Sequence, residues 1–237
     1  RQACRLARKY GPDDIKLFIN DYNLESFWDN NKKLRSLINW IKKWEADGVT
    51  KIDGIGTQMH LSCSMNDETL NNRKKHITQM FQLMANSGKL VRVSELDMGM
   101  DDANGNAVKT ENMTEAMHQR MASYYEWIIK QYLKIIPASQ QWGICQWCAT
   151  DSPANSGWRA NTPVGIWDLN YYRKHVYAGF VRGLGGIPTG IEGIKANENA
   201  CNNSIYDIHG QRFADGTDIS TLPAGIYIVN GKKVVKR

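Results

Sequence analysis

Residues 90–97, Leu-Val-Arg-Val-Ser-Glu-Leu-Asp, are the stretch around which the chain is organised. The branched apolar residues of the first half are typical of a parallel strand that is buried on both faces. Strand side chains alternate, so Glu95 and Asp97 should project to the same side at the predicted strand end. In parallel α/β folds the C-terminal ends of strands carry the chemistry. Alone, the stretch indicates either a catalytic carboxylate at Glu95 or a solvated acid at a strand exit.

The rest of the chain alternates strands with amphipathic helices. Strands are predicted at 15–19, 52–59, 90–97 and 142–147, and helices at 4–10, 32–47, 68–85, 113–136 and 171–184. This order predicts an α/β fold with parallel strands and right-handed crossovers. Polar residues such as Gln58 and His60 fall repeatedly at strand ends, as in a barrel. A complete eight-stranded barrel needs about 250 residues, so we expect about four βα units.

Composition narrows the class of protein. The chain has 237 residues, 42% hydrophobic and 23% charged, which is enough for a full core. No apolar run reaches the roughly 20 residues of a membrane span. The net charge of +6 is scattered along helices and concentrated only at the C-terminal end, so we expect no nucleic-acid partner. Because the chain opens on Arg1 without an initiator Met, we expect a processed terminus or a fragment.

Cysteines and aromatic residues differ in what they indicate. The five cysteines are too few for a disulfide scaffold, and Cys145 and Cys148 form a C-x-x-C without a second pair at zinc spacing. We interpret them as two small apolar residues near a strand end. The eight tryptophans and ten tyrosines are more informative, because flat aromatic faces suit ligands such as sugars.

The composition changes after residue 184. Residues 185–203 are rich in Gly and Asn and are predicted to be a linker. Short antiparallel strands are predicted at 204–208, 225–229 and 232–235, with turns at His209-Gly210 and Asn230-Gly231. We therefore expect three parts: a partial barrel domain at 1–184, the linker, and a small β-rich part at 204–237.

Four segments together carry a family resemblance. They are LFINDYN at 17–23, IDGIGTQMH at 52–60, VSELD at 93–97, and the stretch from Trp147 to Trp158-Arg159. In this order they resemble the C-terminal half of a glycoside hydrolase family 10 endo-β-1,4-xylanase, which is a (β/α)8 TIM barrel. The resemblance covers about residues 1 to 184 and implies xylan or xylo-oligosaccharides as the substrate, with no cofactor and no metal.

The resemblance also implies roles for single residues. Glu95 would be the nucleophile of a retaining mechanism, with His60 and Asp97 orienting and tuning it. The residues implied to contact sugar are Asn20, Tyr22, Asn23, Gln58, Trp147, Trp158 and Arg159. Of these, the two tryptophans would wall the site of the sugar being cleaved. The role of Arg159 is less defined.

The chain departs from the family pattern in three places. The acid/base Glu of the family has no counterpart, so its partner would be a missing N-terminal half of the barrel, and this chain alone would be inactive. Residue 148 is Cys where the family usually has Gly, and the loop from Trp147 to Trp158 is longer than usual. The alternative is a non-catalytic xylan-binding remnant, in which Trp147, Trp158 and Tyr22 bind sugar without turnover.

The C-terminal part resembles a second family, the sorting tails of the bacterial type IX secretion system. The matching segments are 205–212, 222–229 and 232–236. This resemblance implies export, to the cell surface or the medium. The alternative is a small β appendage that only packs on the barrel.

Overall fold

The computed structural model describes residues 1–186, 205–207, 213, 217–229 and 232–236. The chain divides into two compact units, Arg1–Ile187 and Pro188–Arg237. Each unit is described by itself.

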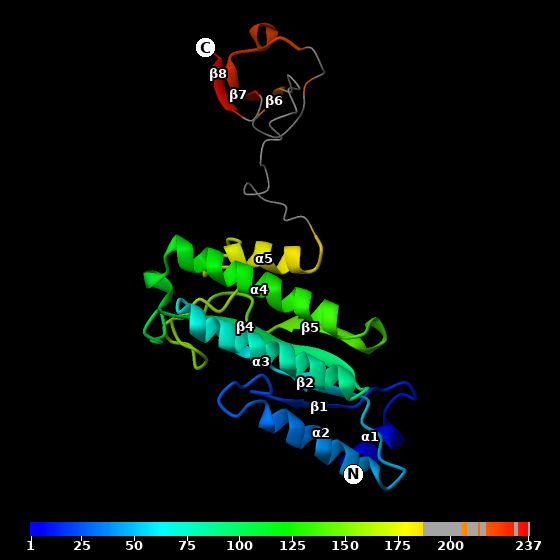
Figure 1. Ribbon diagram of the computed structural model, residues 1–237. Helices are drawn as coiled ribbons and strands as arrows, with labels where there is room; N and C mark the ends of the chain where they lie inside the picture. Colours follow the sequence, from blue (N-terminus) through cyan, green and yellow to red (C-terminus); the bar gives the residue numbers. More distant parts are fainter. Residues whose placement is uncertain (187–204, 208–212, 214–216, 230–231, 237) are drawn as a thin grey trace. The chain divides into compact units, whose positions relative to one another are not determined.

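A parallel sheet forms the centre of the larger unit (Figure 1). Its strands are β1 (Phe18–Asp21), β2 (Gly54–Thr57), β4 (Leu90–Asp101) and β5 (Gln141–Gln146), which pair side by side in this order. A fifth strand, β3 (His60–Ser64), pairs in parallel with the C-terminal half of β4. The predicted parallel α/β arrangement is confirmed.

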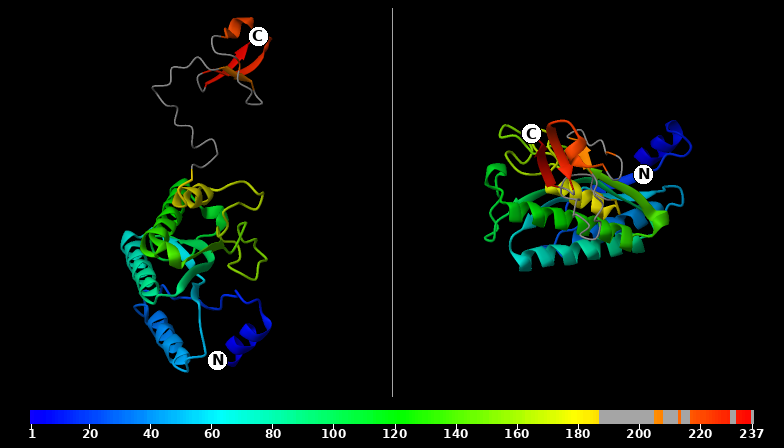
Figure 2. Two further views of the ribbon diagram at one scale, coloured as in Figure 1. Left: turned by 90° about the vertical axis from the view of Figure 1, so that its right-hand side faces the viewer. Right: turned by 90° about the horizontal axis from the view of Figure 1, so that it is seen from above.

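Helices cover one face of this sheet (Figures 1 and 2). They are α2 (Lys32–Glu45), α3 (Asp67–Asn86), α4 (Glu115–Ile135) and α5 (His175–Gly183). The short helix α1 (Gln2–Tyr10), which has no buried residue, precedes β1 and is not part of this layer. Side chains cap the two long helices: Asn66 accepts from the backbone N–H of Thr69, and Thr114 accepts from that of Met117. Helices α4 and α5 pack against each other closely.

The core lies between the sheet and the long helices α3 and α4. Val91 and Val93 of β4 are fully buried, as the apolar character of residues 90–97 predicts. They belong to one cluster with Phe81 of α3 and Tyr132 of α4. Tyr132 also donates its hydroxyl to the carbonyl of Val91 at 2.8 Å, which satisfies a buried polar group at the centre of the sheet.

The first strand begins at Phe18 and not at residue 15. Three further predicted boundaries are wrong for reasons that the structure shows. Strand β4 runs on to Asp101 because β3 pairs with its second half, so Glu95 and Asp97 lie within the strand and not at its end. The predicted strand 52–59 stops at Thr57, and Met59 turns the backbone with a φ of 59°, so that His60 begins β3. Helix α5 starts four residues later than predicted, after a turn closed by Asp168.

The smaller unit contains an antiparallel sheet in the order β6-β7-β8. Its strands are β6 (Ile205–Asp207), β7 (Gly225–Val229) and β8 (Lys232–Lys236), which confirms the expected short antiparallel strands. Ile205 and Tyr227 are its buried residues among those described. The predicted turns at 209–210 and 230–231 and the linker from residue 187 onward lie outside the described residues. In the described ranges, no helix combines the length and hydropathy of a membrane span.

Candidate active site

Two carboxylates of β4, Glu95 and Asp97, lie within 3.3 Å of the ring nitrogens of His60. His60 places its Nε2 atom 3.3 Å from Glu95 Oε2 and its Nδ1 atom 3.2 Å from Asp97 Oδ2. The Nδ1 contact is close in distance but is not aligned as a hydrogen bond. Glu95 and Asp97 thus project to the same side of the strand, as their spacing predicts, and the imidazole lies between them.

The backbone before His60 explains how the ring reaches both acids. Met59, the residue before it, is fully buried and has left-handed backbone geometry, which is uncommon for a side chain other than glycine. The following strand β3 is in register with β4, with His60 directly opposite Asp97. Left-handed residues of this kind are concentrated at functional sites, where the surrounding structure holds them.

Asp97 is fully buried and is held by three neighbours. Trp158 donates its indole N–H to Oδ2 at 2.8 Å, and an Arg159 guanidinium nitrogen lies 3.5 Å from Oδ1. Burial raises the pKa of Asp97 above its ordinary value, and the opposing effects of Arg159, Trp158 and His60 only partly offset it. Asp97 is therefore placed to hold its neighbours and not to face solvent.

The second oxygen of Glu95 is bound from β1. Asn20 donates its side-chain N–H to Glu95 Oε1 at 3.2 Å, and its own oxygen accepts from the hydroxyl of Ser94 at 2.7 Å. The carbonyl of Thr57, 3.2 Å from the Ser94 hydroxyl, is the alternative acceptor for the same hydrogen. Sequence reasoning did not select Ser94, because a serine beside a strand acid has no distinguishing pattern. Both oxygens of Glu95 thus have a partner, which fixes the carboxylate rotamer.

Two exposed tryptophans stand beside this histidine. The ring centroids of Trp158 and Trp147 lie 4.6 Å and 5.9 Å from that of His60. Trp147 is 52% exposed and Trp158 is 40% exposed, although both lie near the fully buried Asp97. Exposed aromatic faces beside an ordered carboxylate suit a ligand with flat apolar faces and hydroxyl groups.

The remaining predicted sugar contacts lie at the ends of β1 and β2. Gln58 is placed there by its backbone N–H, which donates to the carbonyl of Asp21 at 3.0 Å. Asn23, with a φ of 57°, lines a cavity together with His60. Tyr22 is 54% exposed and is turned toward α2, where the ammonium of Lys33 lies 3.6 Å from its ring centroid.

A buried ion pair holds the loop that carries Trp158. Lys174 donates to Asp151 at 2.5 Å and to the carbonyls of Pro163 and Gly165, each at 3.0 Å. The adjacent Ser152 donates its hydroxyl to the carbonyl of Trp158 at 2.7 Å. Lys174 was missed because its partner is 23 residues away in the sequence, and such a contact leaves no local pattern.

In the part of the chain that the structure describes, no group of three or more His, Cys, Asp or Glu residues could hold a metal ion. Cys145 and Cys148 are free thiols, of which Cys145 is exposed. Around Glu95 the structure places a carboxylate with a partner on each oxygen, near the exposed rings of Trp147 and Trp158.

The fold and this site define the class of protein: a parallel α/β enzyme fold with an ordered carboxylate on a strand of the sheet. The family model for glycosyl hydrolase family 10 matches residues 1–182. The chain therefore belongs to glycosyl hydrolase family 10. The sheet and helices of the larger unit are the C-terminal part of its (β/α)8 barrel, and the small antiparallel sheet follows it.

Similar proteins agree with this family. The chain is 32% identical over 154 residues to endo-beta-1,4-xylanase Xyn10C of Cellvibrio japonicus, covering 64% of this chain and 24% of that protein. It is 27% identical over 189 residues to endo-1,4-beta-xylanase B of Humicola insolens, covering 77% and 47%. Among solved structures, a mutant xylanase 10C of Cellvibrio japonicus in complex with xylopentaose matches with a TM-score of 0.62 at 28% identity, covering 78% of this chain and 37% of that one. The chain thus spans less than half the length of these relatives.

Proposed function

We propose that this chain carries the nucleophile and part of the sugar-binding surface of an endo-acting, retaining hydrolase of β-1,4-xylosidic bonds in xylan. The observation that carries the proposal is the position of His60 between Glu95 and Asp97, with Asn20 on the other oxygen of Glu95. The xylanases named among the relatives, and the xylopentaose complex of one of them, support xylan as the substrate.

In the proposed reaction, the Glu95 carboxylate attacks the anomeric carbon of the sugar. A bond forms between Glu95 and that carbon, while the bond to the departing sugar oxygen breaks, leaving a covalent glycosyl ester. The departing oxygen takes a proton from a second carboxyl group, which then activates the water that hydrolyses the ester. Asn20 and His60 hold the attacking carboxylate in one rotamer throughout.

We infer that the second carboxyl group lies on the N-terminal half of a family 10 barrel, outside these 237 residues. Among the described residues, the carboxylate joined to Glu95 through His60 is Asp97, and it is unsuited to this role. It is fully buried and bound by Trp158 and Arg159, whereas a leaving-group acid must reach the substrate. The chain alone should therefore leave xylan intact.

The remaining residues are proposed to bind the sugar chain. Trp147 and Trp158 would stack on the sugar being cleaved and exclude bulkier substituents. The polar side chains proposed to bind neighbouring sugars are Asn20, Tyr22, Asn23, Gln58 and Arg159. Of these, Arg159 would act mainly through Asp97 and the carbonyl of Leu61, to which it donates at 2.6 Å.

The test is the Glu95→Gln variant, made in a protein that contains the complete barrel. Gln has nearly the same shape but cannot form the glycosyl ester, so xylan hydrolysis should fall at least 10³-fold, roughly, while binding of xylo-oligosaccharides persists. Glu111→Gln, a change of an exposed acid, is the matched control. Activity within tenfold of the wild type would rule out the nucleophile role. Wild-type protein that binds xylan but never cleaves it would favour the non-catalytic alternative.

We also propose that the smaller unit acts as an export signal, which would place the protein at the cell surface or in the medium. The support is the resemblance of its segments to type IX sorting tails, together with a separate antiparallel sheet in a unit distinct from the site residues. In a protein that contains the complete barrel, deleting residues 204–237 should then abolish xylanase activity at the surface of the native host but spare activity in the lysate. Unchanged surface activity after the deletion would contradict the export role.

A further inference from the structure

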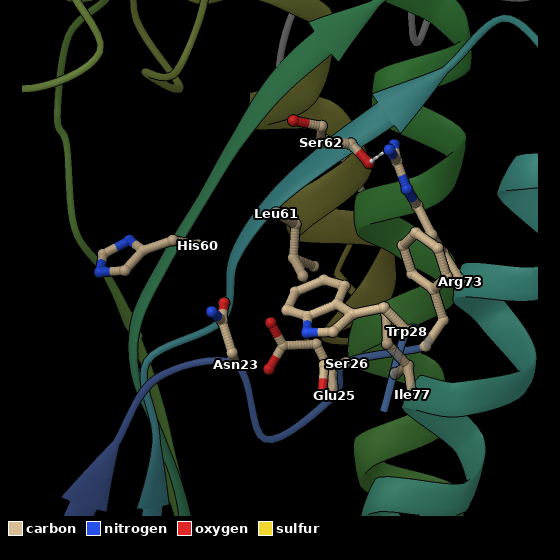
Figure 3. Close-up of a pocket in the computed structure, with 10 residues that line it drawn as sticks. Asn23, Glu25, Ser26, Trp28, His60, Leu61, Ser62, Arg73 and Ile77 are labelled. Atoms are coloured by element: carbon tan, nitrogen blue, oxygen red, sulfur yellow. Dashed lines mark hydrogen bonds between the residues drawn. The ribbon is translucent and has the colours of Figure 1, made fainter. Parts of the chain in front are cut away.

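A cavity lies beside the candidate active site, beneath the loop that follows β1. Its volume is about 140 Å³, roughly ten times what a single water needs. Asn23 and Glu25 from the loop, His60 and Ser62 from β3, and Arg73 from α3 contribute polar groups to its lining. In Figure 3 the His60 ring points away from Glu25 and Trp28, while Asn23 lies between the two groups.

Glu25 is an unusual residue for such a place. It is only 8% exposed, and its Oε2 atom has no hydrogen-bond partner among the described residues. Its carboxylate oxygens face the space between Asn23 and Leu61 (Figure 3). A buried oxygen without a partner is unfavourable, so a ligand that donated a hydroxyl hydrogen to it would remove part of this penalty.

The charges in the cavity favour an uncharged ligand. Arg73 is already neutralised, because it donates to Asp101 at 2.8 Å and to the carbonyl of Ser62 at 2.7 Å. Burial raises the pKa of Glu25 to about 7, so the carboxyl group is mostly protonated in mildly acidic solution and can donate as well as accept. Once Glu25 ionises, its negative charge would repel an anionic ligand.

The shape of the cavity adds a second requirement. Leu61 and Ile77 provide apolar walls, and Trp28, which is 64% exposed, stands at the rim. A flat ring with one apolar face and several hydroxyl groups could pack its apolar face against these walls and donate a hydroxyl hydrogen to the unpaired oxygen of Glu25. Asn23 and His60 line the cavity and are also assigned to the proposed active site. A group in the cavity could therefore be attached to a sugar bound there.

We propose that this cavity binds a neutral pentose branch of the substrate chain, through a hydrogen bond to Glu25 and contact with Trp28. This inference rests on the proposed function, because it takes the main chain to lie across Asn23 and His60. It adds a specificity element: the site would select branched over unbranched xylan segments.

The experiment compares two xylo-oligosaccharides of equal main-chain length, one unbranched and one with a single arabinofuranose branch. Their affinities for the complete 237-residue chain are measured by calorimetry at pH 5.5, with the indole N–H of Trp28 followed by NMR. The wild type should bind the branched ligand about tenfold more tightly, the effect of one well-placed hydrogen bond. The Trp28 signal should shift with the branched ligand alone.

Variants of Glu25 separate the cavity from the main-chain site. Glu25→Leu should remove the preference and leave the affinity for the unbranched ligand unchanged. Glu25→Gln, which keeps the shape and both hydrogen-bonding roles, should retain it, and exposed Glu68→Gln serves as the control. Equal affinities for the two ligands in the wild type, or a preference that survives Glu25→Leu, would overturn the proposal and leave the proposed function intact. Failure of both ligands to bind would instead contradict the proposed function, and the cavity proposal with it.

Discussion

At the scale of single residues, burial sets the chemistry of two carboxyl groups near the site in different ways. Asp97 is buried among donors, since Trp158 and Arg159 both approach it. Glu25 is buried with one oxygen unpaired, and its pKa rises from the ordinary 4.5 to about 7. The contacts of Asp97 hold Trp158 and Arg159 in place, whereas the burial of Glu25 makes the stability of the folded state depend on pH.

The raised pKa of Glu25 has a direct consequence for stability. A buried acid whose pKa is higher in the folded state contributes fully below pH 4.5, and this contribution is lost as the pH rises through about 7. The shift corresponds to about 3 kcal/mol. We therefore expect Glu25→Gln to raise the free energy of unfolding by about 2–3 kcal/mol at pH 8 and to change it little at pH 4.5. Urea denaturation at the two pH values measures this. An equal effect at both would contradict the assignment.

At the scale of structural elements, the segment between β5 and α5 depends on a close backbone approach. A Cβ atom on Gly165 would lie 2.1 Å from the backbone carbon of Thr150, a distance that real structures do not tolerate. Gly157, in the same segment, has open space around the corresponding position. The backbone of this segment is therefore closely packed against Thr150 at Gly165, whereas the space around Gly157, next to Trp158, is open.

This difference predicts unequal effects of the same substitution. Gly165→Ala should lower the free energy of unfolding by about 2 kcal/mol or more, because the backbone has to move. Gly157→Ala should change it by less than about 0.5 kcal/mol. Thermal or chemical denaturation of the two variants under one condition provides the comparison. A similar loss of free energy of unfolding in both variants would mean that the close backbone contact at Gly165 does not constrain the segment.

The buried ion pair at the base of the same segment makes a further prediction. Lys174→Met leaves Asp151 buried without its partner, which should cost about 3–5 kcal/mol. Replacing both residues, as Lys174→Met with Asp151→Leu, removes both charges and should recover much of the loss. Denaturation of the single and double variants gives the coupling between them. A double variant as unstable as the single one would show that the pair is not what stabilises the segment.

The elements also show how far sequence reasoning reaches. Helices such as α3 and α4 are predicted well because their apolar spacing and caps are local. The break at Met59 and the extension of β4 to Asp101 depend on pairing between β3 and β4, which local patterns do not contain. Glu95, His60 and Asp97 were selected by strand alternation and family resemblance together. Ser94 and Lys174 were missed because their contacts are distant in the sequence.

At the scale of the whole molecule, the larger unit presents a sheet of four neighbouring parallel strands, with β1 and β5 at its outer positions. The site residues come from several strands: Asn20 from β1, Glu95 from β4, Trp147 from just after β5, and His60 from β3, which pairs with the second half of β4. The sheet thus brings these described residues together around Glu95, the proposed nucleophile. The acid that protonates the leaving group is a separate requirement.

That separation allows the central claim to be measured on this chain itself. A 2-fluoro-xylobioside with a dinitrophenolate leaving group needs no proton from an acid, so the nucleophile alone can form the glycosyl ester, and the fluorine slows its hydrolysis. After incubation, mass spectrometry of the digested protein should find the sugar on the peptide that contains Glu95. Folded Glu95→Gln protein should remain unlabelled. Labelling of another residue, or no labelling of folded wild-type chain that binds xylo-oligosaccharide, would contradict the assignment of Glu95 as the nucleophile.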